Sequence, residues 1–295
     1  IRMGNRKAWI EAMRPRTLPV SVAGVLAGTA CAMFDTRCDW RPAVCCLLFA
    51  LLAQIASNFA NEYFDFRNGL DRKGREGFRR GVTEGDISPE AMRNATFLTL
   101  LAAAIPGGLL ILWGGWWLVG VGLLIGIFAL AYSAGPYPLS HHGLGDIAVI
   151  LFFGLVPVGF TAWLMTSDTA ILPMALMAGG GVGLLAANVL IVNNYRDMED
   201  DRAVGKRTTV VIFGRRTMAY VYLMNCIAGL MLLCAPVFYG NTWCVLPLLT
   251  LPLAMRVWRG ILRHEGQQLN GDLKRTAQTL LLATLFLLAE AIIKM

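Results

Sequence analysis

A stripe of amide and carboxylate side chains follows an apolar segment in the first quarter of the chain. Behind the apolar run 43–52, the residues Gln54, Asn58, Asn61 and Asp65 lie four, three and four positions apart. On a helix this spacing places all four side chains on one face. Polar side chains on an apolar helix are costly unless they contact a polar partner. Capping of the helix end explains Asn61 and Asp65, but not Gln54 nearly three turns deeper, so the stripe indicates a functional site.

A second stripe of the same kind lies about 130 residues further along the chain. The segment NNYRDMEDDRAVGKRT at 193–208 carries Asn193, Asp197 and Asp201 at intervals of four residues, with Asp200 beside the last of them. Each stripe ends an apolar segment and is followed by residues rich in Gly, Arg and Lys. We therefore expect the two stripes to face each other at one end of a helical bundle.

The residue types in the two stripes suit a metal-bound diphosphate. Carboxylate and amide oxygens are preferred ligands of Mg²⁺, which usually also binds waters and phosphate oxygens of a substrate. The stripes predict a metal site with Asp65 and Asp197 as the catalytic acids, supported by Asn61, Asn193 and Asp201. The basic side chains expected to bind diphosphate oxygens are Arg67, Arg72, Lys73, Arg80, Arg196, Lys206 and Arg207. At the end of an apolar bundle, such a site indicates a lipid diphosphate that leaves an allylic cation when the diphosphate departs.

The composition places both stripes in a membrane protein. The chain has 295 residues, of which 56% are hydrophobic, and this fraction is too high for a soluble domain of that length. We expect one all-α domain over 1–295, with long loops at 65–94 and 196–216 that carry the Asp-rich motifs. Segments of about 20 apolar residues predict nine transmembrane helices, at 17–34, 42–64, 95–113, 116–134, 146–165, 171–195, 217–238, 243–258 and 276–293.

The basic residues predict the orientation of this bundle. The segments 1–16, 65–94, 196–216 and 256–275 carry 23 of the 26 Lys and Arg residues, and all four lie on one side of a nine-helix bundle. The positive-inside rule places this side and the N-terminus in the cytoplasm and the C-terminus outside. The net charge of +7 is explained by topology, so no nucleic-acid partner is expected.

Other kinds of site are not indicated by the sequence. The seven cysteines lie mostly in apolar segments without a C-x-x-C pair, so they predict buried thiols rather than a metal site or disulfides. The chain has three histidines, and His141 and His142 are predicted to lie on the surface of a cytoplasmic loop. No glycine-rich nucleotide loop and no Ser/His/Asp arrangement is present in the sequence.

The motifs resemble those of the UbiA-type intramembrane prenyltransferases. The two Asp-rich motifs are similar to that family, and RPRTLPVSVAGVLAG (14–28), RRGVTEGDISPEAM (79–92) and YSAGPYPLSHHGLGD (132–146) are similar to its naphthoate-specific branch. They cover the first two-thirds of the chain in the expected order. The resemblance implies Mg²⁺-dependent transfer of a polyprenyl group from polyprenyl diphosphate to 1,4-dihydroxy-2-naphthoate with loss of CO₂. The product would be demethylmenaquinone, made for menaquinone in the cytoplasmic (inner) membrane of a bacterium.

Two departures from the wider family affect the expected site. The wider family tends to have a second Asp where this chain has Gly69, so the resemblance implies a metal or water-network role for Asp71. Pro136 stands where other branches carry basic residues, so phosphate binding is expected to fall on Lys206 and Arg207. Membrane anchoring also explains Arg14, and packing also explains Tyr132. The residues expected to contact the substrates are Gln54, Asn58, Arg14 and Tyr132.

Two alternatives to this function stay open. Another aromatic acceptor, such as 4-hydroxybenzoate, is the alternative within the family. A transporter is the alternative from a different class, because acids within the membrane also mark substrate paths. The acids gather at one membrane face and no inverted repeat is evident, which favours the enzyme.

The prenyl tail needs a place within the bundle. We expect an apolar cavity that runs from the stripes toward the middle of the membrane and opens to lipid. The glycines at 179, 180, 181 and 183 are one place where small side chains would make room for it, although helix packing explains the same residues.

Cysteine labelling tests the predicted topology. We expect Arg72→Cys and Val204→Cys, introduced one at a time, to react with a membrane-impermeant thiol reagent from the cytoplasmic side, because both positions lie in basic loops. Labelling is compared in inside-out and right-side-out vesicles, and the unaltered chain gives the background from its own cysteines. Labelling of the two positions from opposite sides would rule out this topology.

Overall fold

The structure, a computed structural model, describes residues 6–35, 38–74, 77–241 and 244–294. Every regular element within these ranges is a helix, which confirms the all-α prediction. Six helical segments in the described ranges are long and apolar enough to cross a membrane, so the chain is a multi-pass membrane protein. They are Arg41–Arg67, Pro89–Gly114, Gly145–Thr166, Thr169–Ala203, Thr209–Tyr239 and Gly266–Lys294.

Helix is present in each of the nine predicted segments. The first five correspond to α2 (Pro19–Met33), α3 (Arg41–Arg67), α5 (Pro89–Leu109) with α6 (Ile111–Gly114), α7 (Trp117–Ala131), and α8 (Gly145–Val149) continued by η2 (Ile150–Leu155) and α9 (Val156–Thr166). The last four correspond to α10 (Leu172–Ala203), α11 (Thr209–Leu233), α12 (Leu251–Ile261) and α13 (Leu269–Lys294). Because α2 and α7 are short apolar helices and α12 has 11 residues, the count of nine spans stays a prediction.

The helix boundaries differ from the prediction at both Asp-rich motifs. The sequence predicts a loop over 196–216, whereas α10 continues to Ala203 and α11 begins at Thr209. The acids do not end α10 because several of them pair with basic side chains, as Asp197 does with Arg196. Within 65–94, α3 extends to Arg67 and a short helix, α4 (Gly81–Glu84), forms inside the loop.

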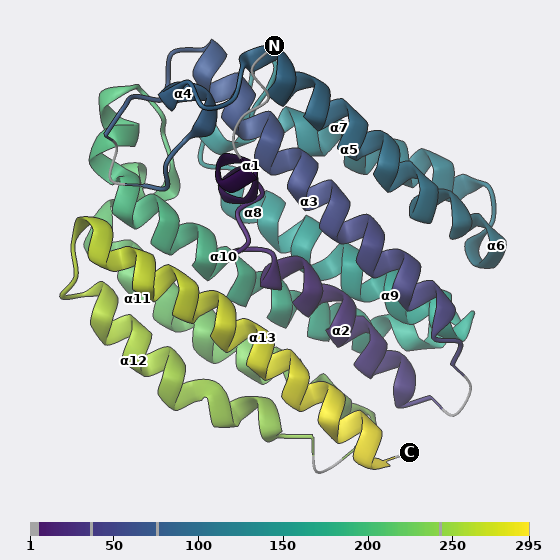
Figure 1. Ribbon diagram of the computed structural model, residues 1–295. Coiled ribbons are helices and arrows are strands. Elements are labelled where there is room, and N and C mark those ends of the chain that lie inside the picture. Colours follow the sequence, from purple (N-terminus) through teal and green to yellow (C-terminus); the bar gives the residue numbers. More distant parts are fainter. Residues whose placement is uncertain (1–5, 36–37, 75–76, 242–243, 295) are drawn as a thin grey trace.

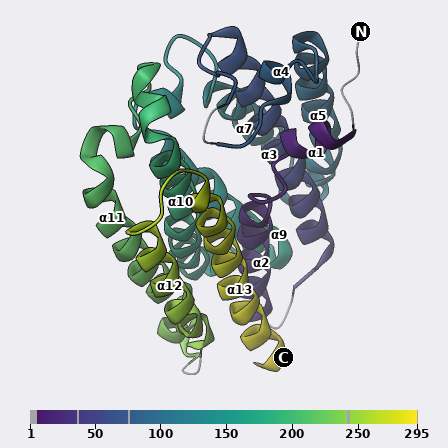
Figure 2. The ribbon, with the colours of Figure 1, turned by 60° about the vertical axis from the view of Figure 1, so that its left-hand side comes forward.

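The long helices lie side by side in one bundle, with the two Asp-rich motifs at the same end. In Figure 1, α4 and the connection from α10 to α11 lie at one end, and the C-terminus lies at the opposite end. Figure 2 shows the same arrangement from another side, with the short helix α1 (Arg6–Ala12) lying across the motif end. The motifs, which are far apart in the sequence, are therefore brought to one end of the bundle.

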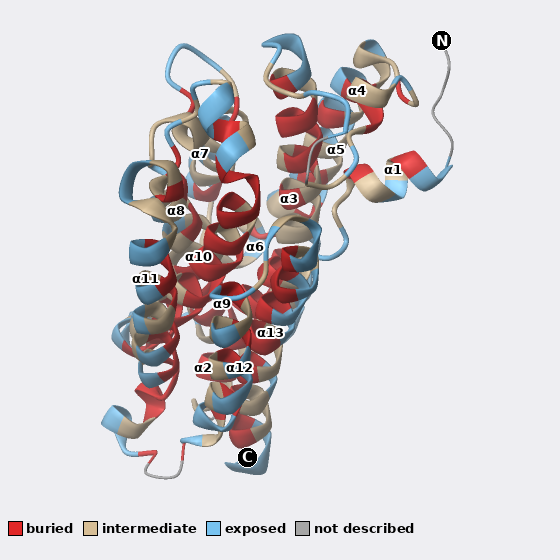
Figure 3. Ribbon diagram, turned by 90° about the vertical axis from the view of Figure 1, so that its left-hand side faces the viewer, coloured by how far each residue is buried: buried red, intermediate tan, exposed pale blue. Residues whose placement is uncertain are grey.

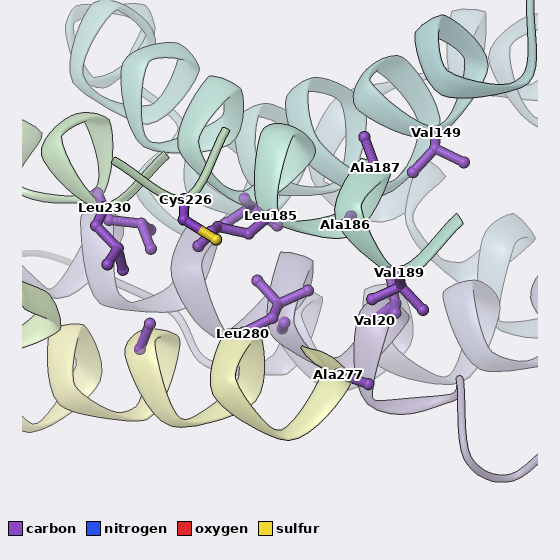
Figure 4. Close-up of a cluster of buried hydrophobic side chains, with 14 of the residues drawn as sticks. Val20, Val149, Leu185, Ala186, Ala187, Val189, Cys226, Leu230, Ala277 and Leu280 are labelled. Atoms are coloured by element: carbon purple, nitrogen blue, oxygen red, sulfur yellow. The ribbon is translucent and has the colours of Figure 1, made fainter. Parts of the chain in front are cut away.

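Helix α10 is the centre of the bundle. It packs against α2, α9, α11 and α13, and Figure 3 shows its buried residues along most of its length. In the close-up of Figure 4, Leu185 of α10 lies near Cys226 of α11 and Leu280 of α13, and Val189 of α10 lies beside Val20 of α2. Helix α7 contrasts with α10, because Leu118 is its only buried residue.

Glycines allow α10 to approach its neighbours closely. A Cβ atom on Gly154 of η2 would lie 2.4 Å from the carbonyl oxygen of Gly179 and 2.5 Å from the Cα of Gly183. A Cβ atom on Gly181 would lie 2.6 Å from the carbonyl oxygen of Gly229 in α11. The expectation that these α10 glycines make room for a lipid tail is wrong, because they lie at helix–helix contacts.

Substituting Gly154 tests this close packing. We expect Gly154→Ala to destabilise the fold by about 1–3 kcal/mol, because the added methyl group would overlap the backbone of α10. The measurement is thermal unfolding of the detergent-purified protein. Gly126→Ala on α7 is the control, since a Cβ atom there meets nothing within 4 Å. Equal melting temperatures for the two variants would contradict the packing described here.

Candidate active site

The two Asp-rich motifs meet at Asp65, in the last turn of α3. The side chain of Asp65 is almost fully buried, and the Nζ of Lys206, from the connection after α10, lies 2.9 Å from its Oδ2. The Nη2 of Arg80 lies 3.9 Å from the same oxygen. The Nε2 of His141 lies 3.7 Å from the other carboxylate oxygen, Oδ1. Three segments therefore bring basic groups to one buried carboxylate.

Asn61, one turn before Asp65, connects the stripe to two Arg side chains. Its Nδ2 donates to Asp65 Oδ2 at 3.3 Å and to Ser133 Oγ at 2.9 Å. Its Oδ1 accepts hydrogen bonds from Arg80 Nη2 at 3.1 Å and from Arg14 Nη2. Arg14 has a left-handed backbone with φ of +55°, which is uncommon for a residue other than glycine and is found at functional sites.

Glu62 holds the first turn of α4 (Gly81–Glu84), next to Arg80, and sequence reasoning did not identify it. The Glu62 side chain is 1% exposed, and its Oε1 accepts a hydrogen bond of 3.0 Å from the backbone N–H of Val82 in α4. Arg80 is the residue directly before α4, and its Nε lies 3.4 Å from Asp71 Oδ2. The adjacent polar residues Asn61 and Glu62 were the signal in the sequence for this contact. Successive side chains on a helix point in different directions, so two adjacent polar residues indicate polar partners on two different segments.

Lys206 is positioned by contacts of the backbone around it. Its own N–H donates to the carbonyl of Asp201 at 2.9 Å, and the N–H of Arg207 donates to the carbonyl of His141 at 2.9 Å. Gly205 has a φ of +75°, which allows the turn that directs the chain back from α10. Asp201 is itself buried, at 7% exposed, and its predicted role as a metal ligand stays a prediction.

The second predicted acid, Asp197, belongs to a neighbouring cluster on α10. Arg196 forms a two-pronged ion pair with it, with Nε 2.7 Å from Oδ1 and Nη2 2.8 Å from Oδ2. The same guanidinium donates to Asn193 Oδ1 at 2.9 Å and to Asn270 Oδ1 of α13 at 2.7 Å. Arg196 also lies 4.8 Å from the ring of Phe78, in the first motif's loop.

A second ion pair links the loop of the first motif to the part of the second motif that lies in α10. Arg72 pairs with Asp200, although the sequence predicted a role in diphosphate binding for that Arg. Three other predicted phosphate-binding residues have exposed side chains and are not placed at Asp65: Arg67, Lys73 and Arg207. The structure thus brings Arg80 and Lys206 to Asp65, and Arg196 to Asp197.

The deeper part of the first stripe holds the segment between α1 and α2. Ser21 Oγ donates to Gln54 Oε1 at 2.6 Å, and Gln54 Nε2 donates to the carbonyl of Thr17 at 3.0 Å. Asn58 Nδ2 donates to the carbonyl of Met13 at 3.0 Å, next to Arg14. These hydrogen bonds account for the polar residues that helix capping left unexplained.

An apolar cavity extends from this polar end into the bundle. Gln54 and Tyr132 line it near the motifs, and Leu118 and Leu164 line it farther along. Its walls are formed mainly by α3, α7 and the α8–α9 segment, and not by the glycines of α10. Tyr132 directly follows α7, and its carbonyl accepts a hydrogen bond of 2.7 Å from Ser140 Oγ.

The donor set near Asp65 fits a bound cation and an anion together. Asp65 Oδ1 is buried and accepts no hydrogen bond from the described residues. The other groups of the stripes are carboxylate and amide oxygens, which suit Mg²⁺. No three His, Cys, Asp or Glu side chains in the described ranges are close enough together to hold a metal ion. The acids are paired with Lys and Arg instead, so a metal would replace basic partners that suit phosphate.

Known proteins of one family are similar to this chain. A family model described as the UbiA prenyltransferase family matches residues 21–288. The 1,4-dihydroxy-2-naphthoate octaprenyltransferase of Escherichia coli is 33% identical over 96% of this chain and 94% of its own. The Haemophilus influenzae protein of the same name is 36% identical over 80% of this chain and 79% of its own.

A solved structure shares the fold. It is a UbiA homolog from Archaeoglobus fulgidus bound to DMAPP and Mg²⁺, and it has a TM-score of 0.59 over 95% of this chain and 99% of its own, at 18% identity. The family model covers most of the chain, and the two curated relatives align with 96% and 80% of it. This chain therefore belongs to the UbiA prenyltransferase family.

Proposed function

We propose that this chain transfers a polyprenyl group from polyprenyl diphosphate to 1,4-dihydroxy-2-naphthoate, with Mg²⁺ and with loss of the ring carboxylate as CO₂. The direct product is the quinol form of demethylmenaquinone, because the ring keeps its two hydroxyl groups and no oxidant takes part. The reaction takes place in the cytoplasmic membrane of a bacterium. The observation that carries the proposal is the gathering of Lys206, Arg80 and His141 around Asp65 at the polar end of an apolar cavity. The names of the curated relatives support the naphthoate as acceptor.

The basic residues bind the diphosphate in this proposal. Lys206 and Arg80 contact its oxygens and neutralise the charge that develops as the bond from oxygen to the allylic carbon breaks. Mg²⁺, when bound, supplies further positive charge to the leaving diphosphate. It would be held by oxygens of Asn61, Asp65, Asp71, Asn193, Asp197 and Asp201.

Binding of the substrate exchanges the ion pairs of the site. In the structure Lys206 pairs with Asp65 and Arg196 pairs with Asp197. A buried ion pair contributes little net stability, because the cost of removing both charges from water offsets their attraction. A metal ion can therefore replace the basic partner of each acid, and the diphosphate can replace the acidic partner of each basic residue. Neither exchange requires the fold to change.

The acceptor is expected at the mouth of the cavity. Arg14 binds its carboxylate in this proposal, which is supported by the hydrogen bond from Asn58 to the carbonyl of the neighbouring Met13. Tyr132 and Gln54 line the cavity where the ring meets the allylic carbon. The electron-rich ring attacks that carbon, and the carbon–carbon bond to the ring carboxylate then breaks to release CO₂.

Product analysis tests the proposed reaction. The detergent-purified protein is incubated with Mg²⁺, octaprenyl diphosphate and an equimolar mixture of 1,4-dihydroxy-2-naphthoate and 4-hydroxybenzoate, and the products are identified by mass. We expect the prenylated, decarboxylated naphthalene product. Prenylated 4-hydroxybenzoate as the main product would assign the other acceptor, and the absence of any transfer would contradict the proposed enzyme.

Removal of charge from either acid is expected to abolish this turnover. Asp65→Asn and Asp197→Asn keep the shape of the side chain but lower its affinity for a cation, so each should reduce the rate on the order of 10³-fold. The variants are compared with the unaltered chain in the same assay, and thermal unfolding verifies that they are folded. Near-native rates in either variant would show that its stripe serves only the fold.

A matched pair of glycines on α7 tests the path of the prenyl tail. Gly122 lines the apolar cavity, whereas Gly120 is exposed on the same helix. We expect Gly122→Phe to lower the rate with octaprenyl diphosphate much more than the rate with dimethylallyl diphosphate, because the ring occupies space beyond the first isoprene units. Gly120→Phe should leave the ratio of the two rates unchanged. Equal ratios in both variants would exclude this cavity as the tail site.

A further inference from the structure

The Nε2 of His141 and the Oδ1 of Asp65 are two buried atoms that face each other without a hydrogen bond between them. Its Nε2 lies 3.7 Å from Asp65 Oδ1, which is beyond hydrogen-bond distance. Both atoms are buried, and neither has a hydrogen-bond partner among the residues that the structure describes. Buried polar atoms without a partner are rare in folded proteins and call for a reason such as a missing ligand.

The position of His141 is fixed by its backbone. Its N–H donates to the carbonyl of Pro138 at 3.0 Å, and its carbonyl accepts the N–H of Arg207 at 2.9 Å. The residue ends the short helix η1 (Leu139–His141), and Leu139 in that helix lines the apolar cavity. The imidazole therefore sits between the cavity and the turn that carries Lys206.

His142, the next residue, has none of these features. Its ring stacks on Tyr137, with the ring centroids 3.6 Å apart. Its Nδ1 lies 2.9 Å from the carbonyl oxygen of Pro138. One histidine of the pair is thus used within its own loop, and the other presents a ring nitrogen to the buried carboxylate of another helix.

We propose that His141 is a substrate-binding residue whose Nε2–H donates a hydrogen bond to a diphosphate oxygen beside Asp65. This inference rests on the proposed function, and it adds a residue that the sequence placed on the surface. Lys206 and Arg80 on the same carboxylate make this part of the buried site basic, so an anion is favoured there over the neutral ring of the acceptor. This hydrogen bond requires only an N–H donor and no proton transfer, so a neutral imidazole can form it.

The test compares variants of the two adjacent histidines in the full-length, detergent-purified protein. His141→Ala should weaken binding of inorganic diphosphate in the presence of Mg²⁺ by about tenfold or more, as expected for loss of a hydrogen bond to a charged group. It should raise the KM for polyprenyl diphosphate and leave the KM for the aromatic acceptor unchanged. His141→Gln should recover part of the affinity, because its amide supplies an N–H donor. His142→Ala and His142→Gln should match the unaltered chain.

The other outcomes overturn the proposal in different ways. Unchanged diphosphate binding with a raised acceptor KM would assign His141 to the acceptor. A lower melting temperature with unchanged diphosphate affinity would leave only a structural role. Failure of the proposed function is separate, because it would appear as no prenyl transfer by the unaltered chain to any aromatic acid. Diphosphate binding can be measured in either case.

Discussion

The ion pair between Lys206 and Asp65 joins two motifs that lie 141 residues apart in the chain, with a separation of 2.9 Å between Nζ and Oδ2. Much of the surrounding structure serves to bring these two groups together. Helix α3 carries Asp65 to the end of the bundle, and the turn at Gly205 returns Lys206 from the end of α10. A buried ion pair of this kind adds little to the stability of the fold, because the cost of removing both charges from water offsets their attraction. The surrounding residues fix its position instead. That balance suits a place where ligands must enter and leave.

The last helix of the chain also takes part in the site. Asn270, in the first turn of α13, accepts from Arg196, and Arg196 in turn holds Asp197 and lies against Phe78 in the first motif's loop. The resemblance found in the sequence covered only the first two-thirds of the chain, so it did not point to this contribution. The site thus depends on nearly the whole length of the chain, from Arg14 to Asn270.

Periodicity made the helices and the stripes predictable, because a helix that faces lipid must be apolar over its length and polar residues there need a cause. The direction of individual side chains was not predictable in the same way. Gln54 shares a face with Asp65, yet it bonds to Ser21 and Thr17 because α2 happens to pack there. His141 lies within a Gly- and Pro-rich loop whose path depends on contacts with the residues around Lys206. Such contacts between distant segments leave no repeating pattern in the sequence.

The loose packing of α7 has a consequence for how the tail is accommodated. This helix forms one wall of the apolar cavity but buries only Leu118 against the rest of the chain. Its other residues are apolar and at least partly exposed, so we expect the surrounding lipid as well as protein contacts to set its position. In the proposed reaction, the thickness and lateral pressure of the bilayer therefore act on one wall of the cavity that receives the prenyl tail. The proposed tail path thus implies that the same protein prefers different prenyl donors in a detergent micelle and in its native membrane.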